Sequence, residues 1–256
     1  MELKFKFNED EVNYDMYRPG YPNELFQNII AYSNMKNDSK LLEIGIGTGQ
    51  ATLPFLELGC DVTAIEIGDR LSKFVDEKYK DYPKFKVIND NFMNLNINDK
   101  SLDMVYSATA FHWLPVEERC RKVFDSLKSG STVALFWNHP FTCRENDITN
   151  IYSKRVYDKY RPSNKKQTEF CLEDCDKYTS ELALAGFVNI QCKLYKRVRC
   201  LTVDEYIHLL NTYSDHHALP DDIKTKFEKE MRDTLNNIGG KINIYDTIDL
   251  YLAQKP

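Results

Sequence analysis

The stretch Leu41–Thr52 reads LLEIGIGTGQAT and decides the expected fold. It begins inside an apolar strand, expected over 40–44, and then breaks into a loop with glycines at positions 45, 47 and 49. Glycine adopts positive φ angles and allows another group to approach the backbone closely. The helix expected over 50–58 would present its first backbone N–H groups to such a group. The stretch therefore predicts a nucleotide-like ligand at the end of a strand.

The glycine spacing separates the classes of nucleotide ligand. A dinucleotide fingerprint, G-x-G-x-x-G, needs a small residue at position 50, where this chain has Gln50. A P-loop needs Gly-Lys-Ser/Thr, which this loop lacks. The observed form is E-x-G-x-G-x-G, in which the carboxylate of Glu43 would repel a pyrophosphate. It suits a ligand with an ammonium and a sulfonium, as S-adenosylmethionine (SAM) has.

A second acidic residue supports a nucleoside ligand. Glu66 closes the strand expected over 61–67 and stands 17 positions after Gly49. A carboxylate in this place accepts both hydroxyls of a ribose. Sites for NAD share this feature, so Glu66 indicates a nucleoside without choosing one. A chance turn is the alternative for either motif alone, and the occurrence of both at strand ends disfavours it.

The first half of the chain alternates strand-like and helix-like segments, which indicates an α/β fold with a mostly parallel sheet. The expected strands are 40–44, 61–67, 85–89, 102–107 and 131–137, and the expected helices are 23–35, 50–58, 69–80 and 116–128. Asn23 is the expected N-cap of the first helix, and Gly130 the expected stop of the last. The second half predicts helices at 145–160, 178–185, 204–213 and 224–238, and strands at 186–199 and 242–253.

The domain organisation follows from where helices interrupt the last strands. Ligands of open α/β folds bind beyond the carboxyl ends of the strands, so we expect the inserted helices to cap that edge. The expectation is one domain over 1–256, with an N-terminal lid segment over 1–22 and cap insertions at 140–180 and 202–238.

A third element follows the strand at 85–89. It reads Asp90-Asn91-Phe92-Met93-Asn94-Leu95 and leads to Ser101-Leu102-Asp103. With these residues the chain resembles the class I SAM-dependent methyltransferases of the methyltransferase-11 type. The segments A-F-H-W at 110–113, YDMYRPGYP at 14–22 and the run at 204–216 resemble the branch that includes trans-aconitate methyltransferases. The resemblance implies a Rossmann-like, seven-stranded, mostly parallel sheet with an antiparallel last strand and helices on both faces.

The resemblance also implies a set of cofactor contacts. Asn91 takes the place of the residue that binds the adenine amino group, with the Phe92 N–H at the ring. The family more often has Asp there, but an Asn amide oxygen also accepts a hydrogen bond, and Asp90 is the alternate. The residues expected around the cofactor are Tyr17, Arg18, Glu43, Gly45, Gly47, Thr48, Gly49, Glu66, Ile67, Asn91, Phe92, Ser107, His112 and Trp113.

Methyl transfer from SAM is an in-line displacement at a carbon that the sulfonium already activates. The protein mainly aligns donor and acceptor and excludes water, so a catalytic base is optional. His112 follows the fourth strand and is the candidate base, since its ordinary pKa lies near 6.5. The alternative, given equal weight, is a histidine that packs near the cofactor or orients the substrate. Trp113 is expected to contact adenine or wall the pocket, with an ordinary core position as its alternative.

Residues outside these motifs are expected near the substrate. Tyr14 and Tyr17 are expected to form a lid that is mobile without ligand. Arg18 is expected to pair with the methionine carboxylate of SAM or an acidic substrate, the alternative being a surface arginine beside a Tyr-Pro turn. Tyr213 and His216 are expected to line the acceptor pocket. The neighbouring histidines at 216 and 217 would diverge on a helix, and no spaced carboxylate ligand accompanies them, so no metal is expected.

Composition limits the partners. The net charge of −5 and the pI of 5.6 give no general attraction to nucleic acid or an anionic membrane. No apolar run approaches the roughly 20 residues that cross a bilayer, and residues 1–15 lack the apolar core of a signal peptide, so the expected location is cytoplasmic. The seven cysteines are expected to be reduced structural thiols. Lys165 and Lys166 are expected on a solvated loop.

The leading hypothesis is therefore a SAM-dependent methyltransferase, monomer or homodimer, that acts on a small-molecule carboxylate, hydroxyl or amine. A second hypothesis keeps the fold and changes the substrate to tRNA or protein, which the acidic pI and compact cap disfavour. A third is a non-catalytic SAM-binding protein. Gln50 disfavours an oxidoreductase.

Overall fold

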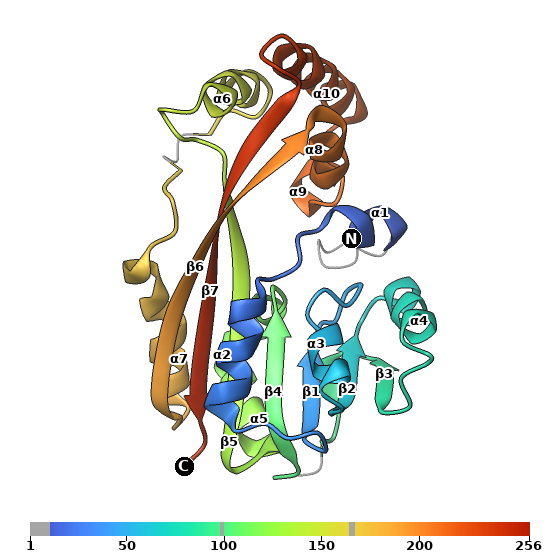
Figure 1. The fold of residues 1–256 in the computed structure, drawn as a ribbon, viewed down its shortest axis with the longest axis vertical. Coiled ribbons are helices and arrows are strands. Elements are labelled where there is room, and N and C mark those ends of the chain that lie inside the picture. Colours follow the sequence, from blue (N-terminus) through green and yellow to red (C-terminus); the bar gives the residue numbers. More distant parts are fainter. Residues whose placement is uncertain (1–10, 98–99, 164–166) are drawn as a thin grey trace. The chain divides into compact units, whose positions relative to one another are not determined.

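The structure is a computed structural model that describes residues 11–97, 100–163 and 167–256 (Figure 1). Residues 1–10 of the expected lid segment, and Lys165 and Lys166, lie outside the described residues. The first elements are α1 Glu11–Tyr17, α2 Asn23–Ser33, β1 Lys40–Ile44, α3 Leu53–Glu57, β2 Asp61–Glu66, α4 Asp69–Lys78, β3 Phe85–Asn89 and β4 Leu102–Ala108. They are followed by α5 Val116–Ser126, β5 Leu127–Phe141, α6 Ile148–Tyr160, α7 Asp176–Leu184, β6 Val188–Thr202, α8 Val203–Leu210, α9 Ser214–His217, α10 Asp221–Asn236 and β7 Lys241–Gln254. Short 3₁₀ turns are η2 Phe92–Asn94, η3 Phe111–Trp113 and η4 Leu172–Cys175.

The strands form one seven-stranded sheet in the order β3-β2-β1-β4-β5-β7-β6. β1 pairs in parallel with β2 and β4, β2 with β3, and β4 with β5. β7 runs opposite to its neighbours β5 and β6 (Figure 1). This confirms the predicted Rossmann-like, mostly parallel sheet with an antiparallel last strand. The strand order reverses between β1 and β4, which is the place where open α/β sheets bind ligands.

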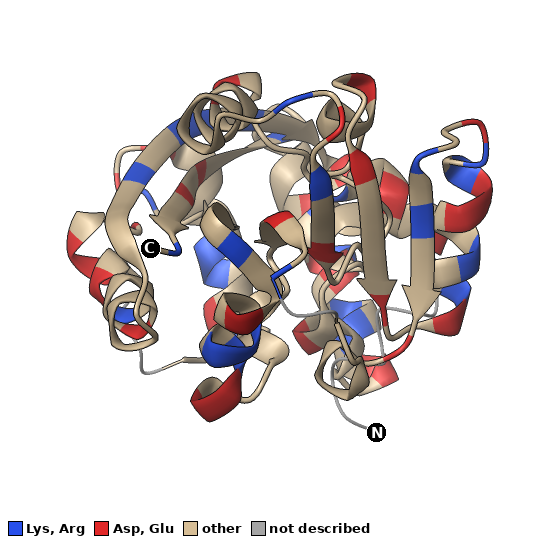
Figure 2. Ribbon diagram, turned by 90° about the horizontal axis from the view of Figure 1, so that it is seen from below, with Lys and Arg blue, Asp and Glu red and all other residues tan. Residues whose placement is uncertain are grey.

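The outer strand β6 carries an unusual charge pattern. Its basic residues are Lys193, Lys196, Arg197 and Arg199, and it has no acidic residue. Lysines on an edge strand oppose pairing with the edge of another molecule. Arg197 and Arg199 instead pair with the buried Asp246 of β7 at 2.9 and 2.6 Å. On the helices, Figure 2 shows acidic and basic residues interspersed. No described helix is both long and apolar enough to cross a membrane.

The chain divides into two compact units. The sheet unit comprises residues 19–138, 171–195 and 248–256, and the helical unit comprises 139–170, 196–247 and the described part of 1–18. The long strands β5, β6 and β7 contribute residues to both units. Residues 171–180, expected in the cap, fall in the sheet unit. The cap's position over the sheet edge stays a prediction.

Aromatic residues from two helices and two strands form the centre of the sheet unit. Phe26 of α2 meets Phe55 of α3 at 5.7 Å between ring centroids and Phe136 of β5 at 6.3 Å. Phe55 in turn lies 4.7 Å from Tyr106 of β4. Burial of each such ring contributes about 1.5–3 kcal/mol. Leu41 of β1 lies in the same core, which therefore fixes β1 and β4 and hence the loops that leave their carboxyl ends.

In the helical unit, α6 and α8 pack against α10 and cover three of its residues. These are Phe227, Met231 and Leu235, all fully buried. α8 begins with a capping box, in which Thr202 Oγ1 accepts the Glu205 N–H at 3.3 Å and Glu205 Oε2 accepts the Thr202 N–H at 2.8 Å. The α10 face opposite Phe227 is charged, so the helix is amphipathic.

The expected helix signals at Asn23 and Gly130 are wrong. Pro22 is the N-cap of α2, without a side-chain bond, and Asn23 is the first helical residue. α5 ends at Ser126, and Gly130 lies inside β5 with φ 78°. The reason is strand pairing: the Gly130 N–H donates to the carbonyl oxygen of Lys255 at 2.7 Å. The backbone after Ser126 therefore bonds to a neighbouring strand and not to a helical turn.

Candidate cofactor site

The loop between β1 and α3 contains three glycines with positive φ. The values are 72° at Gly45, 58° at Gly47 and 85° at Gly49, a region that other residues rarely adopt. The Gly45 N–H donates to the carbonyl oxygen of Ile65 at 2.9 Å, which ties the loop to β2. A Cβ added at Gly45 would lie 2.4 Å from the Cβ of Ala110. The loop therefore packs against the segment that follows β4.

Two residues at the end of α4, its last residue Lys78 and the following Tyr79, bond to this loop. Tyr79 Oη donates to the Gly49 carbonyl oxygen at 2.8 Å, and a Cβ at Gly49 would lie 2.5 Å from that hydroxyl. Lys78 Nζ donates to the carbonyl oxygen of Thr48 at 2.8 Å. Thr48 is buried, and its Oγ1 accepts a bond from Gln50 Nε2 at 2.5 Å. The glycine loop is thus fixed by hydrogen bonds to β2 on one side and to the end of α4 on the other.

Glu66 joins the end of β2 to the glycine loop. Its Oε2 accepts the Gly47 N–H at 3.0 Å and its Oε1 accepts the Gly68 N–H at 2.8 Å. The side chain is only 6% exposed. Burial raises the pKa of Glu66, while the bonds from the Gly68 and Gly47 amides act in the opposite direction. Each carboxylate oxygen accepts more than one bond, so Glu66 retains capacity for ligand hydroxyls. Ile67, which follows it, is half-buried.

Glu43 lies deeper, at 1% exposure. Its Oε2 accepts bonds from Thr52 Oγ1 at 2.7 Å and Tyr106 Oη at 2.8 Å, and its buried Oε1 has no hydrogen-bond partner among the described residues. Burial raises the pKa of Glu43 to about 7; the charge of Glu66 acts in the same direction, and the two hydroxyl bonds oppose it. Two buried acidic groups therefore flank the glycine loop, and a positive charge on a ligand would relieve their repulsion.

The loop after β3 begins with Asp90 and Asn91. Asn91 is the N-cap of η2, since its Oδ1 accepts the Met93 N–H at 3.0 Å. Asp90 Oδ1 accepts the Asn91 N–H at 2.6 Å, and this bond stabilises the start of the turn. Phe92 is buried, and Lys122 Nζ lies 5.1 Å from its ring centroid. The amide oxygen of Asn91 has a second lone pair that can accept a ligand N–H.

The segment after β4 completes this edge of the sheet. Ser107 is buried and its Oγ donates to the Ile44 carbonyl oxygen at 2.8 Å, which links the ends of β4 and β1. Thr109 has a φ of 56°, and its N–H donates to the Phe136 carbonyl oxygen at 2.8 Å. Because β1 to β4 are parallel neighbours, the four loops from their carboxyl ends meet at one edge. The structure thus brings the predicted sheet-unit residues together.

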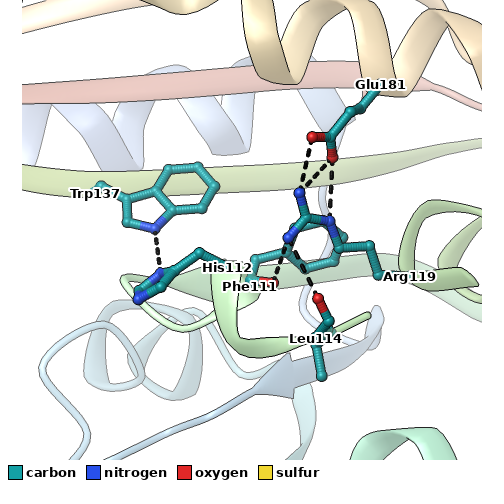
Figure 3. Close-up of polar contacts among 6 residues, drawn as sticks. All are labelled: Phe111, His112, Leu114, Arg119, Trp137 and Glu181. Atoms are coloured by element: carbon teal, nitrogen blue, oxygen red, sulfur yellow. Dashed lines mark hydrogen bonds and ion pairs between the residues drawn. The ribbon is translucent and has the colours of Figure 1, made fainter. Parts of the chain in front are cut away.

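An arginine that sequence reasoning missed fixes the turn η3 (Figure 3). Arg119 of α5 is 1% exposed and donates from Nη1 to the carbonyl oxygens of Phe111 and Leu114 at 3.2 and 3.5 Å. Its Nη2 pairs with Glu181 Oε2 of α7 at 2.6 Å, and its Nε also reaches that carboxylate at 3.1 Å. A sequence signal did exist, since Arg119 occupies an apolar position of α5, three residues after Val116 and four before Val123.

His112 and Trp113 lie in this turn. Both are exposed, and their ring centroids are 4.8 Å apart. His112 Nδ1 lies 3.0 Å from Nε1 of Trp137, a second residue that the sequence did not reveal (Figure 3). The contacts with Trp113 and Trp137 cover part of the imidazole, and this partial burial lowers the pKa of His112 to about 4; the charges of Arg119 and Lys177 act in the same direction. His112 is therefore neutral at physiological pH.

Comparison with known proteins identifies a methyltransferase domain at this edge of the sheet. Residues 42–135, which run from β1 into β5 and include all four loops, match the model of a methyltransferase domain. The chain carries a SAM-dependent methyltransferase domain. An uncharacterized methyltransferase-like protein of Schizosaccharomyces pombe is 25% identical over 91% of this chain and 86% of its own length.

Solved structures of methyltransferases share the fold. A protein of Anaeromyxobacter dehalogenans, provisionally assigned as a type II methyltransferase, superposes with a TM-score of 0.65 at 16% identity, over 93% of this chain and 98% of that one. A phosphoethanolamine N-methyltransferase of Haemonchus contortus, in complex with phosphomonomethylethanolamine and S-adenosylhomocysteine, gives a TM-score of 0.59 at 15% identity, over 100% of this chain and 60% of that one.

The remaining predicted residues of this methyltransferase lie in the helical unit. The Arg18 guanidinium lies over the rings of Tyr14 and Tyr213, 4.8 and 4.4 Å from their centroids, and its Nη2 donates to the Thr212 carbonyl oxygen at 2.7 Å. Tyr17 stacks on the His208 ring with the centroids 4.6 Å apart. The structure thus brings Tyr14, Arg18 and Tyr213 together with one another. Their expected roles at the cofactor and substrate stay predictions.

His216 lies inside the helical unit. It is fully buried, its Nε2 lies 3.0 Å from Glu228 Oε1, and its ring contacts Phe227 at 5.5 Å between centroids. Burial lowers the pKa of His216, and the Glu228 bond opposes this shift. These contacts describe a packed histidine, and its expected place in an acceptor pocket stays a prediction. Among the described residues, no group of three or more His, Cys, Asp or Glu side chains could hold a metal ion.

Proposed function

We propose that the protein transfers a methyl group from SAM to a small-molecule acceptor by in-line displacement. The observation that carries the proposal is the Glu66 carboxylate, which closes the glycine loop through Gly47 and stands next to the turn capped by Asn91. In this proposal Glu66 accepts the ribose hydroxyls, and Asn91 with the Phe92 N–H holds the adenine. The methionine part lies along the glycine loop.

The charge around the loop supports SAM over a dinucleotide. The acidic groups of Glu43 and Glu66 are buried beside the loop, and the charge of Glu66 contributes to the raised pKa of Glu43. A pyrophosphate would add negative charge to this pair, whereas the ammonium and sulfonium of SAM add positive charge. The sulfonium supplies the activated methyl group. The protein aligns the acceptor behind that methyl group and keeps water out.

Three observations support a small acceptor. The net charge is −5, and acidic and basic residues are interspersed on the described helices (Figure 2), so neither feature favours a nucleic-acid substrate. The Haemonchus contortus enzyme of similar fold binds the small molecule phosphomonomethylethanolamine. The A-F-H-W segment, the stretch at 14–22 and the run at 204–216 further support a place beside the trans-aconitate methyltransferases, so carboxylates belong among the acceptors to be tested first.

The test has two stages. Isothermal titration of the full chain with SAM and with S-adenosylhomocysteine measures donor binding, and we expect saturable binding of both. A coupled assay for S-adenosylhomocysteine release then screens carboxylates, alcohols and amines as separate sets. Absence of binding in the titration refutes the proposal. Binding of total tRNA on filters at low salt, together with methylation of that RNA, would replace the small-molecule acceptor with a nucleic acid.

A further inference from the structure

The turn that carries His112 stands at the edge of the sheet proposed to bind SAM. Ala110, two residues earlier, faces Gly45 so closely that an added Cβ would come within 2.4 Å of the Ala110 Cβ. His112 is exposed, so a ligand bound over the glycine loop has access to one side of its ring. The question is which nitrogen of the ring carries the proton.

Trp137 decides the tautomer of His112. An indole N–H only donates, so the contact of 3.0 Å between Trp137 Nε1 and His112 Nδ1 requires Nδ1 to accept. A neutral imidazole has one N–H and one lone pair, so its proton is then on Nε2. Figure 3 shows the second ring nitrogen pointing away from Trp137. The open side of His112 therefore presents an N–H, and its only lone pair is occupied.

Both partners of this bond are held in place. The Trp137 ring stacks on Tyr178, with 4.3 Å between centroids, and its backbone N–H donates to Asp249 Oδ1 at 2.8 Å. The turn itself is fixed by Arg119, which bonds the Phe111 carbonyl and is paired with Glu181. Reorientation of the imidazole would break a bond to a fixed donor and leave that donor unsatisfied.

The charges near His112 also oppose a second proton. The facing charged groups are Arg119 of α5 and Lys177 of α7, both positive, and Glu181 is engaged with Arg119. Their effect adds to the loss of water around the ring, so the imidazole stays neutral well below pH 7. A group in this state donates one hydrogen bond and is a poor proton acceptor.

We propose that His112 acts in methyl transfer as a hydrogen-bond donor through Nε2–H, with Trp137 as the positioning residue that fixes this tautomer, and that it does not act as a base. The inference rests on the proposed function. Its ligand is a carboxylate acceptor, in which one oxygen accepts the Nε2–H and the other attacks. The bond between the methyl carbon and sulfur breaks, its electron pair stays on sulfur, and a lone pair of the attacking carboxylate oxygen forms the new bond to give a neutral ester. His112 gains and loses no proton, and the carboxylate has none to lose.

Nuclear magnetic resonance of the full chain with ¹⁵N-labelled histidine tests the tautomer directly. Two-bond ¹H–¹⁵N spectra distinguish the two neutral forms, and His112→Gln identifies the His112 signals by their loss. We expect the Nε2–H form at pH 7 in the wild type. Trp137→Phe keeps the ring on Tyr178 but removes the N–H, so a mixture of tautomers and a higher His112 pKa are expected. Trp113→Phe is the matched control and should leave the Nε2–H form unchanged. An Nδ1–H form in the wild type, or no change in Trp137→Phe, overturns the inference.

Activity with an acceptor from the screen gives the second readout. Gln at position 112 keeps an N–H donor but cannot act as a base, whereas Leu keeps neither function. We expect kcat/KM of His112→Gln within about tenfold of the wild type and that of His112→Leu reduced well beyond it, with no inflexion near pH 6.5 in the wild-type profile. Equal losses of about 10²–10⁴-fold in both variants would identify a base. Absence of SAM binding refutes the proposed function, whereas an Nδ1–H tautomer with intact SAM binding refutes only the role of His112.

Discussion

Glu66 accepts the Gly47 N–H across 3.0 Å, so a carboxylate at the end of β2 closes the loop that follows β1. The same carboxylate also accepts the Gly68 N–H at 2.8 Å, at the start of α4. One buried side chain therefore sets the distance between two loops of the proposed cofactor site. A substitution at Gly47 tests the shape of the loop, and a substitution at Glu66 tests the bonds to the ligand.

Gly47→Val should abolish SAM binding. Valine disfavours the φ of 58° at this position, so the loop would have to change shape and lose the Gly47 N–H bond to Glu66. Isothermal titration with SAM should show no heat of binding. Gly130→Val is the matched control, because Gly130 also has a positive φ, of 78°, and open space around its Cβ position. It should lower stability but leave SAM affinity unchanged, and equal loss of binding in both would point to general unfolding.

Glu66→Gln should weaken SAM binding while the fold is kept. Hydrogen bonds to a charged group contribute about 1.5–3 kcal/mol, which corresponds to a rise in Kd of roughly 10–100-fold. The measurement is Kd for S-adenosylhomocysteine, which has the same ribose and lacks the sulfonium charge. Glu57→Gln, an exposed carboxyl on α3, is the control and should change Kd less than twofold. An unchanged Kd in Glu66→Gln would remove Glu66 from the ribose site.

Glu43 should make stability fall as pH rises from about 4.5 to 7. Its folded pKa of about 7 exceeds the unfolded value of 4.5, so over this window the folded state holds a proton that the unfolded state releases. The full effect is about 3 kcal/mol by the usual conversion of pKa shifts. Above pH 7 the destabilisation caused by Glu43 is constant, and below pH 4.5 it is absent.

Glu43→Gln removes this titration, which makes the prediction measurable. Urea unfolding at pH 5 and pH 8 gives the stability of the variant relative to the wild type at each pH. The free energy of unfolding of Glu43→Gln, relative to that of the wild type, should be roughly 2–3 kcal/mol higher at pH 8 than at pH 5. At pH 5 the variant should be no more stable than the wild type, because its amide N–H₂ is buried where Oε1 has no described partner. A difference that does not depend on pH would contradict the raised pKa.

Much of the sheet unit could be predicted from local patterns. The apolar runs at 40–44 and 61–67 predicted the strands, and the glycines at 45, 47 and 49 predicted the loop between them, because these features depend on neighbours in sequence. Gly130 misled for the opposite reason: its bond to Lys255 joins segments more than a hundred residues apart. The Trp137 contact with His112 has the same origin, since Trp137 lies within β5 and His112 in the turn that follows β4. Such contacts leave no spacing signal in one sequence.

Arg119→Met should destabilise the protein strongly. The change leaves Glu181, which is 17% exposed, without its partner, and it removes the donors for the Phe111 and Leu114 carbonyl oxygens. Breaking a buried pair from one side costs about 3–5 kcal/mol, and the partial exposure of Glu181 brings the expectation to roughly 2–4 kcal/mol. Urea unfolding at pH 7 measures it. Glu181→Gln added to Arg119→Met should recover part of the loss, because no unpaired charge then remains.

Arg121→Met is the matched control on the same helix. Arg121 pairs with Asp125 at 2.9 Å, but both side chains are exposed, at 67% and 45%, so its loss should cost at most about 0.5 kcal/mol. The comparison separates burial from charge, since both substitutions remove one arginine from α5. If Arg119→Met also costs less than 1 kcal/mol, the turn at Phe111 is held by packing alone. The fixed position of His112 would then depend on Trp137 and not on the ion pair.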